Sequence, residues 1–128
     1  MAQVKVYALC ETLEQHRQQL SDAIHKSIMD ALSYPPEKRF IALDPADFIF
    51  PADRSNNYLI IEISMFEGRS IEAKKALIRG LFANISESCG IAPNDIEITL
   101  LETPKETWGI RGQIGDELSL NYKVNVWK

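Results

Sequence analysis

The chain has 128 residues, of which 45% are hydrophobic and 25% are charged, as is ordinary for one soluble globular domain. Its formal net charge of −4 argues against general binding to nucleic acids or to anionic membranes. No apolar stretch approaches the roughly 20 residues that cross a bilayer, and Lys5 and Glu11 interrupt any signal peptide, so we expect a cytoplasmic location.

The first half of the chain is predicted to fold as a strand, a helix and a second strand. Apolar residues alternate over Val4–Ala8, which is the period of a half-buried strand. Over about residues 12–33 the apolar period becomes that of an amphipathic helix, which Pro35-Pro36 brings to an end. A second apolar segment, Phe40–Leu43, follows as the next strand.

The second half repeats this pattern. Alternation over Leu59–Ile63 predicts a strand, and the helical period over about residues 70–89 predicts a helix. Gly90 lies where a left-handed C-terminal cap is expected, and Pro93 follows to stop the helix. The segment Ile96–Leu101 is then the last strand of this half.

The two halves align without gaps when the sequence is shifted by 57 residues. The aligned pairs include Val4 and Ile61, Leu20 and Leu77, Ile28 and Ile85, and Pro36 and Pro93. We therefore expect one domain over residues 1–128, built from two β-α-β repeats at about 3–43 and 58–101.

This duplication predicts an α+β fold. A β-α-β crossover makes its two strands parallel and places the helix on one face, so two such units form a mixed four-stranded sheet with both helices on the same side. The other face of the sheet is then uncovered. We expect its apolar residues to be covered by another subunit, which favours an oligomer.

Two segments lie outside the repeats. Residues 44–57 form a long connection with turn-forming residues at both ends, and its Phe48-Ile49-Phe50 cluster is expected to pack against the domain. Residues 118–127 alternate apolar and polar side chains, which predicts a C-terminal strand. Such a strand is suited to extending a sheet, including that of a neighbouring subunit.

Three features occur in a characteristic order: the duplicated β-α-β units, the turn Gly68-Arg69-Ser70 before the second helix, and the segment Glu-Thr-Pro-Lys-Glu-Thr-Trp-Gly at 102–109. Together they resemble the tautomerase superfamily of 4-oxalocrotonate tautomerase and macrophage migration inhibitory factor, in its longer-chain branch near malonate semialdehyde decarboxylase. The resemblance covers almost the whole chain. It implies a homotrimer built on the open sheet faces and a small keto or enol carboxylic acid as ligand.

The resemblance also implies that the N-terminal amine is catalytic. Family members commonly start Met-Pro, and the proline amine moves a proton between carbon and oxygen of the substrate. This chain has Ala2 at that position. If Met1 is removed, Ala2 offers a primary amine, whose ordinary pKa near 8 an apolar pocket lowers. If Met1 is retained, the amine is displaced by one residue.

Arg69 is the other catalytic residue that the resemblance implies. It lies at a strand end and a helix N-terminus, where a guanidinium can hold a carboxylate bidentately. The alternative is a surface arginine that pairs with Glu67 or Glu72. Lys38 stands where the decarboxylase has an aspartate, so decarboxylation is not expected. Lys38 and Arg39 either add positive charge at the pocket mouth or form a solvated turn.

Three more residues are predicted to bind substrate. Trp108 matches an aromatic residue that helps to wall the pocket in the family, although a tryptophan at a subunit interface has the same sequence pattern. Arg111 lies in a glycine-rich turn that could project it into a pocket, and Arg54 lies in the long connection. Either arginine could instead form an ion pair with Asp53 or Asp116, and for Arg54 we favour that structural role.

No metal or cofactor is expected. Cys10 and Cys89 cannot form a Cys-rich zinc site, and the spacing of His16 and His25 matches no common metal-ligand pattern. The leading functional hypothesis is a protein that binds a keto or enol acid and has weak tautomerase activity. The alternative is a non-catalytic ligand-binding or protein-interaction module with the same fold, which the absence of the proline favours.

Overall fold

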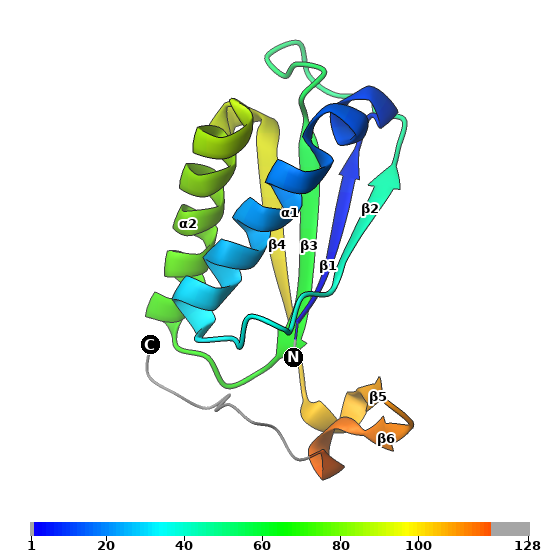
Figure 1. Ribbon diagram of the computed structural model, residues 1–128, viewed down its shortest axis with the longest axis vertical. Coiled ribbons are helices and arrows are strands. Elements are labelled where there is room, and N and C mark those ends of the chain that lie inside the picture. The colour runs from blue at the N-terminus through cyan, green and yellow to red at the C-terminus, as the bar shows by residue number, and fades with distance from the viewer. Residues whose placement is uncertain (1, 119–128) are drawn as a thin grey trace.

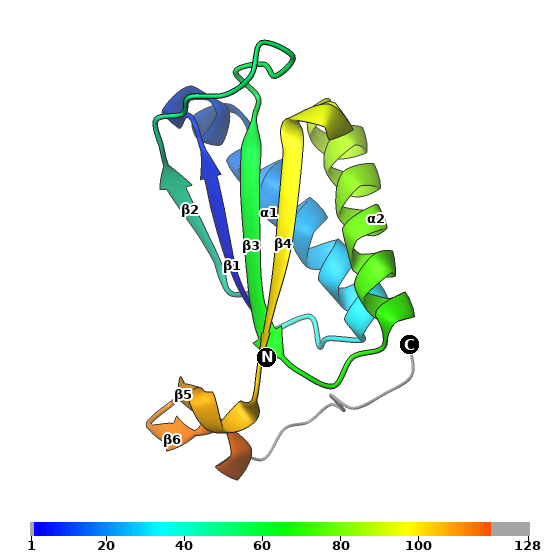
Figure 2. The same cartoon turned by 180° about the vertical axis from the view of Figure 1, so that it is seen from behind.

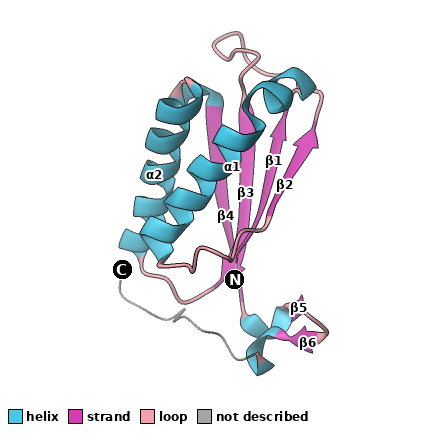
Figure 3. Ribbon diagram, viewed as in Figure 1, coloured by secondary structure: helices cyan, strands magenta, loops and turns pink. Residues whose placement is uncertain are grey.

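The computed structural model describes residues 2–118. Within them, a four-stranded sheet carries two long helices on one face, and a small hairpin lies beyond one end of the sheet (Figures 1 and 3). In chain order the long elements are β1 (Ala2–Ala8), α1 (Cys10–Leu32), β2 (Ile41–Pro45), β3 (Leu59–Phe66), α2 (Ile71–Cys89) and β4 (Ile96–Thr103). The hairpin consists of β5 (Gly109–Ile110) and β6 (Gln113–Ile114).

The sheet has the order β2-β1-β3-β4, and its pairing confirms the predicted fold. β1 is parallel to β2 and β3 is parallel to β4, as two β-α-β crossovers require, whereas β1 and β3 are antiparallel.

The first helix begins earlier than the apolar period predicts. Its first turn contains the exposed residues Cys10 and Glu11, which carry no apolar signal.

The two repeats are related by a pseudo-twofold axis. In the sheet, Lys5 lies opposite Glu62, which is its counterpart in the second repeat. In the helix layer, the Asn84 side-chain amide donates to Ser27 Oγ at 2.9 Å, and these residues are also 57 positions apart. Counterparts that contact each other lie on the axis, which therefore passes through the centre of both layers.

The core lies between the helices and the sheet. Alternate strand residues, among them Val6, Leu59, Ile61 and Ile63, have no exposed surface and pack against apolar helix residues. The second helix ends as predicted, because Gly90 adopts a left-handed φ of 70° and its N–H donates to the carbonyl of Ser86. No helix in the described part of the chain is both long and apolar enough to span a bilayer.

The opposite face of the sheet is uncovered, as the view from behind shows (Figure 2). It is more polar than the sequence pattern led us to expect, because polar residues separate its few apolar side chains. The strand register places these residues on it: Gln3, Lys5, Tyr7, Ala42, Asp44, Ile60, Glu62, Ser64, Glu97, Thr99 and Leu101.

The connection between β2 and β3 packs only in part. The rings of Phe48 and Phe50 lie 4.9 and 5.5 Å from that of Tyr58, whereas Ile49 is fully exposed. Ile49 differs from the prediction because it points away from the ring cluster that its two neighbours form. The strand predicted over residues 118–127 lies, apart from Leu118, outside the described residues.

Candidate functional site

Three of the residues predicted to form a site, Ala2, Trp108 and Arg111, lie at the sheet end at which β1 begins. Ala2 starts β1 opposite Met65, near the end of β3, and is 3% exposed. The backbone N–H of Val4 donates to the carbonyl of Phe40 at 2.9 Å, which brings the segment before β2 alongside. The β5–β6 hairpin lies at the same end of the molecule (Figure 1).

Gln3 is shared by three shallow hollows at this end. The first, of about 300 Å³, is lined by Gln3, Phe40, Gly109, Ile110 and Arg111. The second, of about 400 Å³, is lined by Gln3, Ser64, Thr103, Thr107, Trp108 and Gly109. The third, of about 370 Å³, lies along β1 and β2 and is lined by Gln3, Val4, Lys5, Phe40, Ile41 and Ala42. We refer to the first two together as the candidate site, because they hold the predicted residues Arg111 and Trp108.

Trp108 forms a fixed wall of the candidate site. Its indole Nε1 donates to Thr103 Oγ1 at 2.6 Å, and its ring meets that of Phe66 edge-on, with 5.2 Å between centroids. Phe66 is itself buried at the end of β3. These contacts hold the half-buried indole in one orientation, as a binding wall requires.

Arg111 reaches the candidate site from the tip of the hairpin. It has a φ of 51°, and the next residue, Gly112, has a φ of 77°. Positive φ at both central residues is typical of a tight hairpin turn that favours asparagine or glycine, so an arginine there is strained. Such strain is often found at functional positions. Within residues 2–118 no ion pair joins Arg111 to Asp116 or to another carboxylate.

Arg69 lies outside the candidate site. It is 6% exposed, its Nη1 donates to the carbonyl of Leu32 at 2.8 Å, and its guanidinium carbon lies 5.5 Å from the centroid of the Tyr34 ring. These contacts join the start of the second helix to the end of the first. Arg69 lines neither hollow of the candidate site.

Arg54 is at the opposite end of the sheet. Its guanidinium contacts Asp53 Oδ1 at 2.7 Å and Glu97 Oε1 at 3.2 Å, and the hydrogen bond to Glu97 is the main cause that raises the pKa of Arg54. The hydroxyl of Tyr58 donates to the other oxygen of Glu97 at 2.8 Å. This network ties the long connection to β4, and it includes the ion pair with Asp53 that the structural alternative named.

Arg39 and Lys38 lie in the segment between α1 and β2. Arg39 Nη1 donates to Asp22 Oδ1 at 2.6 Å, and this hydrogen bond lowers the pKa of Asp22. Arg39 is thereby directed toward α1. The half-buried Lys38 donates its backbone N–H to Pro35, in a segment that the buried His25 anchors through Nε2 and the carbonyl of Pro36 at 2.7 Å. Neither residue lines the candidate site.

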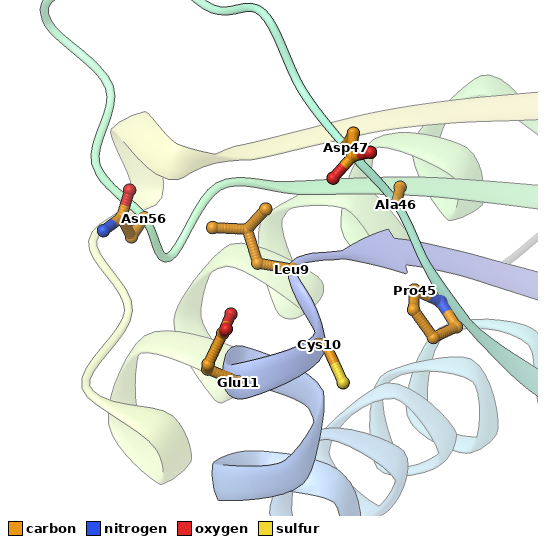
Figure 4. A pocket seen from close by; sticks show the side chains of 7 residues that line it. All are labelled: Leu9, Cys10, Glu11, Pro45, Ala46, Asp47 and Asn56. Atoms are coloured by element: carbon orange, nitrogen blue, oxygen red, sulfur yellow. The ribbon is translucent and has the colours of Figure 1, made fainter.

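A larger hollow, of about 640 Å³, lies at the far end of β1 (Figure 4). Its lining comes from the first turn of α1, the end of β2 and the long connection, and it includes the carboxylates of Glu11 and Asp47 but no cationic side chain. The hydrogen bond with Glu14 is the main cause that raises the pKa of the Cys10 thiol, so this thiol is a poor nucleophile. Because carboxylates and no cationic side chain line this larger hollow, it does not suit an anionic substrate.

Sequence reasoning missed Gln3, Ser64 and Thr103, which line the candidate site beside Trp108 and Arg111. The alternation along β1 was a usable signal for Gln3, because it places this side chain on the face opposite Val4. In the described part of the chain, no three His, Cys, Asp or Glu residues are grouped so that they could hold a metal ion.

Comparison with known proteins places these observations in a family. The model of the family described as tautomerase enzyme matches residues 36–111. A protein of Bacillus subtilis (strain 168), named probable tautomerase YusQ, is 27% identical over 101 residues, which cover 71% of this chain and 78% of that protein.

Two solved structures share the fold. Malonate semialdehyde decarboxylase aligns with a TM-score of 0.75 at 22% identity, over 87% of this chain and 92% of that one. A symmetric trimer of fused 4-OT aligns with a TM-score of 0.75 at 20% identity, over 88% and 94% of the two chains. Because the family model spans more than half of the sequence and the fold agrees, this chain belongs to the tautomerase family.

Proposed function

We propose that this chain binds a small keto or enol carboxylic acid at the candidate site and has weak tautomerase activity from the amine of Ala2. The observation that carries the proposal is the hairpin, which holds Arg111 in a strained turn at the sheet end where β1 begins. A guanidinium there can hold the substrate carboxylate next to the N-terminal amine.

The proposed chemistry needs a group that takes and returns a proton near neutral pH. Removal of Met1 frees the amine of Ala2. An α-amino group has an ordinary pKa near 8, and an apolar pocket would favour its neutral form. The neutral amine removes a proton at one end of the keto-enol system and returns it at the other. Ala2 supplies a primary amine in place of the secondary amine of proline, and we therefore expect a low rate.

We further propose that the protein is a cytoplasmic homotrimer. The uncovered sheet face offers a surface for subunit contacts, and the fused 4-OT of the same fold is a trimer. The proposal assigns no substrate contact to the other four predicted residues. The side chains of Arg69, Arg54 and Arg39 bond to other parts of the chain, and Lys38 lies outside the candidate site.

The test is the ketonisation of phenylenolpyruvate by untagged protein whose intact mass has established its N-terminus. We expect a rate above buffer that is lost when the amine is blocked. Arg111→Asn removes the cation but suits the positive φ, so we expect KM to rise by about tenfold with the fold intact. The matched control Arg79→Ala, on the exposed side of α2, should leave KM unchanged.

Two outcomes would contradict the proposal. A rate that survives blocking of the amine would exclude Ala2 as the base. An Arg111→Asn variant with unchanged KM would exclude Arg111 as the carboxylate ligand. Absence of a rate in the wild type, with activity in Ala2→Pro, would instead identify the chain as a ligand-binding protein that lacks the catalytic base.

A further inference from the structure

Gln3 occupies a central position in the candidate site that the proposed chemistry does not use. It follows Ala2 directly on β1, its side chain is exposed, and it lines both hollows of the candidate site. Because successive strand residues point to opposite faces, the amide of Gln3 lies on the uncovered face while Ala2 faces the core. The register sets Ser64 directly opposite Gln3 on β3.

The two hollows differ in charge. The first contains the guanidinium of Arg111, whereas every residue that lines the second is neutral. The two hollows adjoin at Gln3 and Gly109, which line both of them; we call the first the cationic end of the candidate site and the second its neutral end. Two lysines lie close by but line neither hollow of the candidate site. Lys5 belongs to the third hollow and lies opposite the carboxylate-bearing Glu62, and Lys105 Nζ lies over the Phe66 ring, 6.0 Å from its centroid.

The neutral end is rich in hydrogen-bonding groups. Thr103 Oγ1 accepts from the indole of Trp108 and keeps its own hydroxyl hydrogen to donate. The hydroxyl of Thr107 donates to Pro104 and can still accept. Within the described residues, no hydrogen bond occupies the side chains of Gln3 or Ser64. The amide of Gln3 can both donate and accept at the junction of the two hollows.

We infer that the candidate site selects a 2-oxo acid, or its enol, that has one carboxylate and a neutral hydrogen-bonding tail, and that Gln3 is the specificity-determining residue for that tail. The inference rests on the proposed function, because Arg111 must hold the carboxylate. A second carboxylate in the neutral end would lose water without gaining a cation, and an apolar tail would leave polar groups without partners.

The test compares three acids of equal chain length by isothermal titration calorimetry: 2-oxopentanoate, 4-hydroxy-2-oxopentanoate and 2-oxoglutarate. We expect the wild type to bind the hydroxylated acid about fivefold more tightly than either of the others. Gln3→Leu should lose this preference while it still binds 2-oxopentanoate. Gln3→Glu should weaken binding of all three acids, because its carboxylate would compete for Arg111.

The matched control is Gln19→Leu, the same change at an exposed position of α1, which should keep the wild-type preference. Equal binding of the three acids, or a preference that survives Gln3→Leu, would overturn the inference and leave the proposed function standing. If none of the three acids binds to the wild type, both the proposed function and the inference fail. Thermal unfolding of each variant checks that its fold is intact.

Discussion

Arg69 makes a structural contact that its sequence position does not reveal. Its buried guanidinium donates to the carbonyl of Leu32, one of the carbonyls that the end of a helix leaves without an intrahelical partner. We expect Arg69→Ala to lower the free energy of unfolding by about 2–3 kcal/mol, because the variant leaves that acceptor unsatisfied and empties a buried space. Urea denaturation, with the exposed Arg79→Ala as control, measures the effect.

The opposite result would restore the catalytic hypothesis for Arg69. If Arg69→Ala keeps the stability of the wild type but loses turnover of phenylenolpyruvate, the residue acts on the substrate. If stability falls while KM stays unchanged, the guanidinium is structural. The conservative variant Arg69→Lys retains a charge but has no planar fork, and should fall between wild type and alanine in stability.

Tyr58 couples stability to alkaline pH. Burial, followed by its hydrogen bond to Glu97, raises the pKa of Tyr58 above the ordinary value of 10.0. The folded state therefore holds this proton more tightly than the unfolded state, and the stabilisation is complete below about pH 10 and is lost as the pH rises through the raised value. We expect Tyr58→Phe to be less stable than wild type near neutral pH and to lose stability less steeply above pH 10.

Denaturant unfolding at a series of alkaline pH values tests this expectation. Tyr7 also has a raised pKa, from partial desolvation and from Glu62, so the variant should retain some alkaline dependence. If the free energy of unfolding falls equally steeply with pH in the wild type and in Tyr58→Phe, the hydrogen bond to Glu97 does not hold the proton in solution.

At the scale of elements, the hairpin that carries Arg111 depends on Gly115. The N–H of Gly115 donates to the carbonyl of Trp108 at 2.8 Å, and an added Cβ would overlap the carbonyl oxygen of Lys105 and lie 3.0 Å from Trp108 Cβ. The overlapping oxygen of Lys105 belongs to the backbone, so it cannot move aside as the end of a flexible side chain could. We expect Gly115→Ala to displace the hairpin and weaken acid binding at least tenfold, with little loss of core stability.

Calorimetric titration with the acids and thermal unfolding measure these two effects separately. Gly109→Ala is a comparison for the fold of the hairpin only, because a Cβ there meets no atom within 4 Å but Gly109 itself lines the candidate site. If the Gly115→Ala variant binds the acids as tightly as the wild type, the hairpin does not need this close contact to present Arg111.

At the scale of the whole molecule, the uncovered face is the surface on which the proposed trimer depends. Leu101, on the edge strand β4, is 43% exposed on this face and lines neither hollow of the candidate site. We expect Leu101→Lys to shift the protein from trimer to monomer, because three added charges would be buried in or near the subunit contacts. Light scattering coupled to gel filtration measures the mass of each species.

The exposed Ile71→Lys on α2 is the matched control, since it adds the same charge on the helical side of the molecule. A monomeric wild type would contradict the proposed trimer outright. A trimeric Leu101→Lys variant would place the subunit contacts away from this part of the sheet.

Much of this architecture follows from local patterns. The alternation over Val4–Ala8 and the helical stripe that includes Ile24 and Ile28 correctly predicted which residues are buried. Periodicity is readable because burial of one face selects the same residue type at each repeat of the element. The polar uncovered face was not anticipated, because the crossover argument determines which face is open but not which side chains lie on it.

The sequence by itself determined the two β-α-β units, their duplication and the side of the sheet that the helices cover, because strand and helix periods and stop signals such as Gly90 act over a few residues. Only the tertiary structure decided which of the predicted arginines lie at the hollows beside β1 and which are bonded to other parts of the chain. Arg111 lies beside Gln3, whereas Arg69 and Arg54 bond to Leu32 and Glu97. The physical reason is that a long cationic side chain takes its partner from whatever the fold brings near, and these partners come from segments far away in the chain.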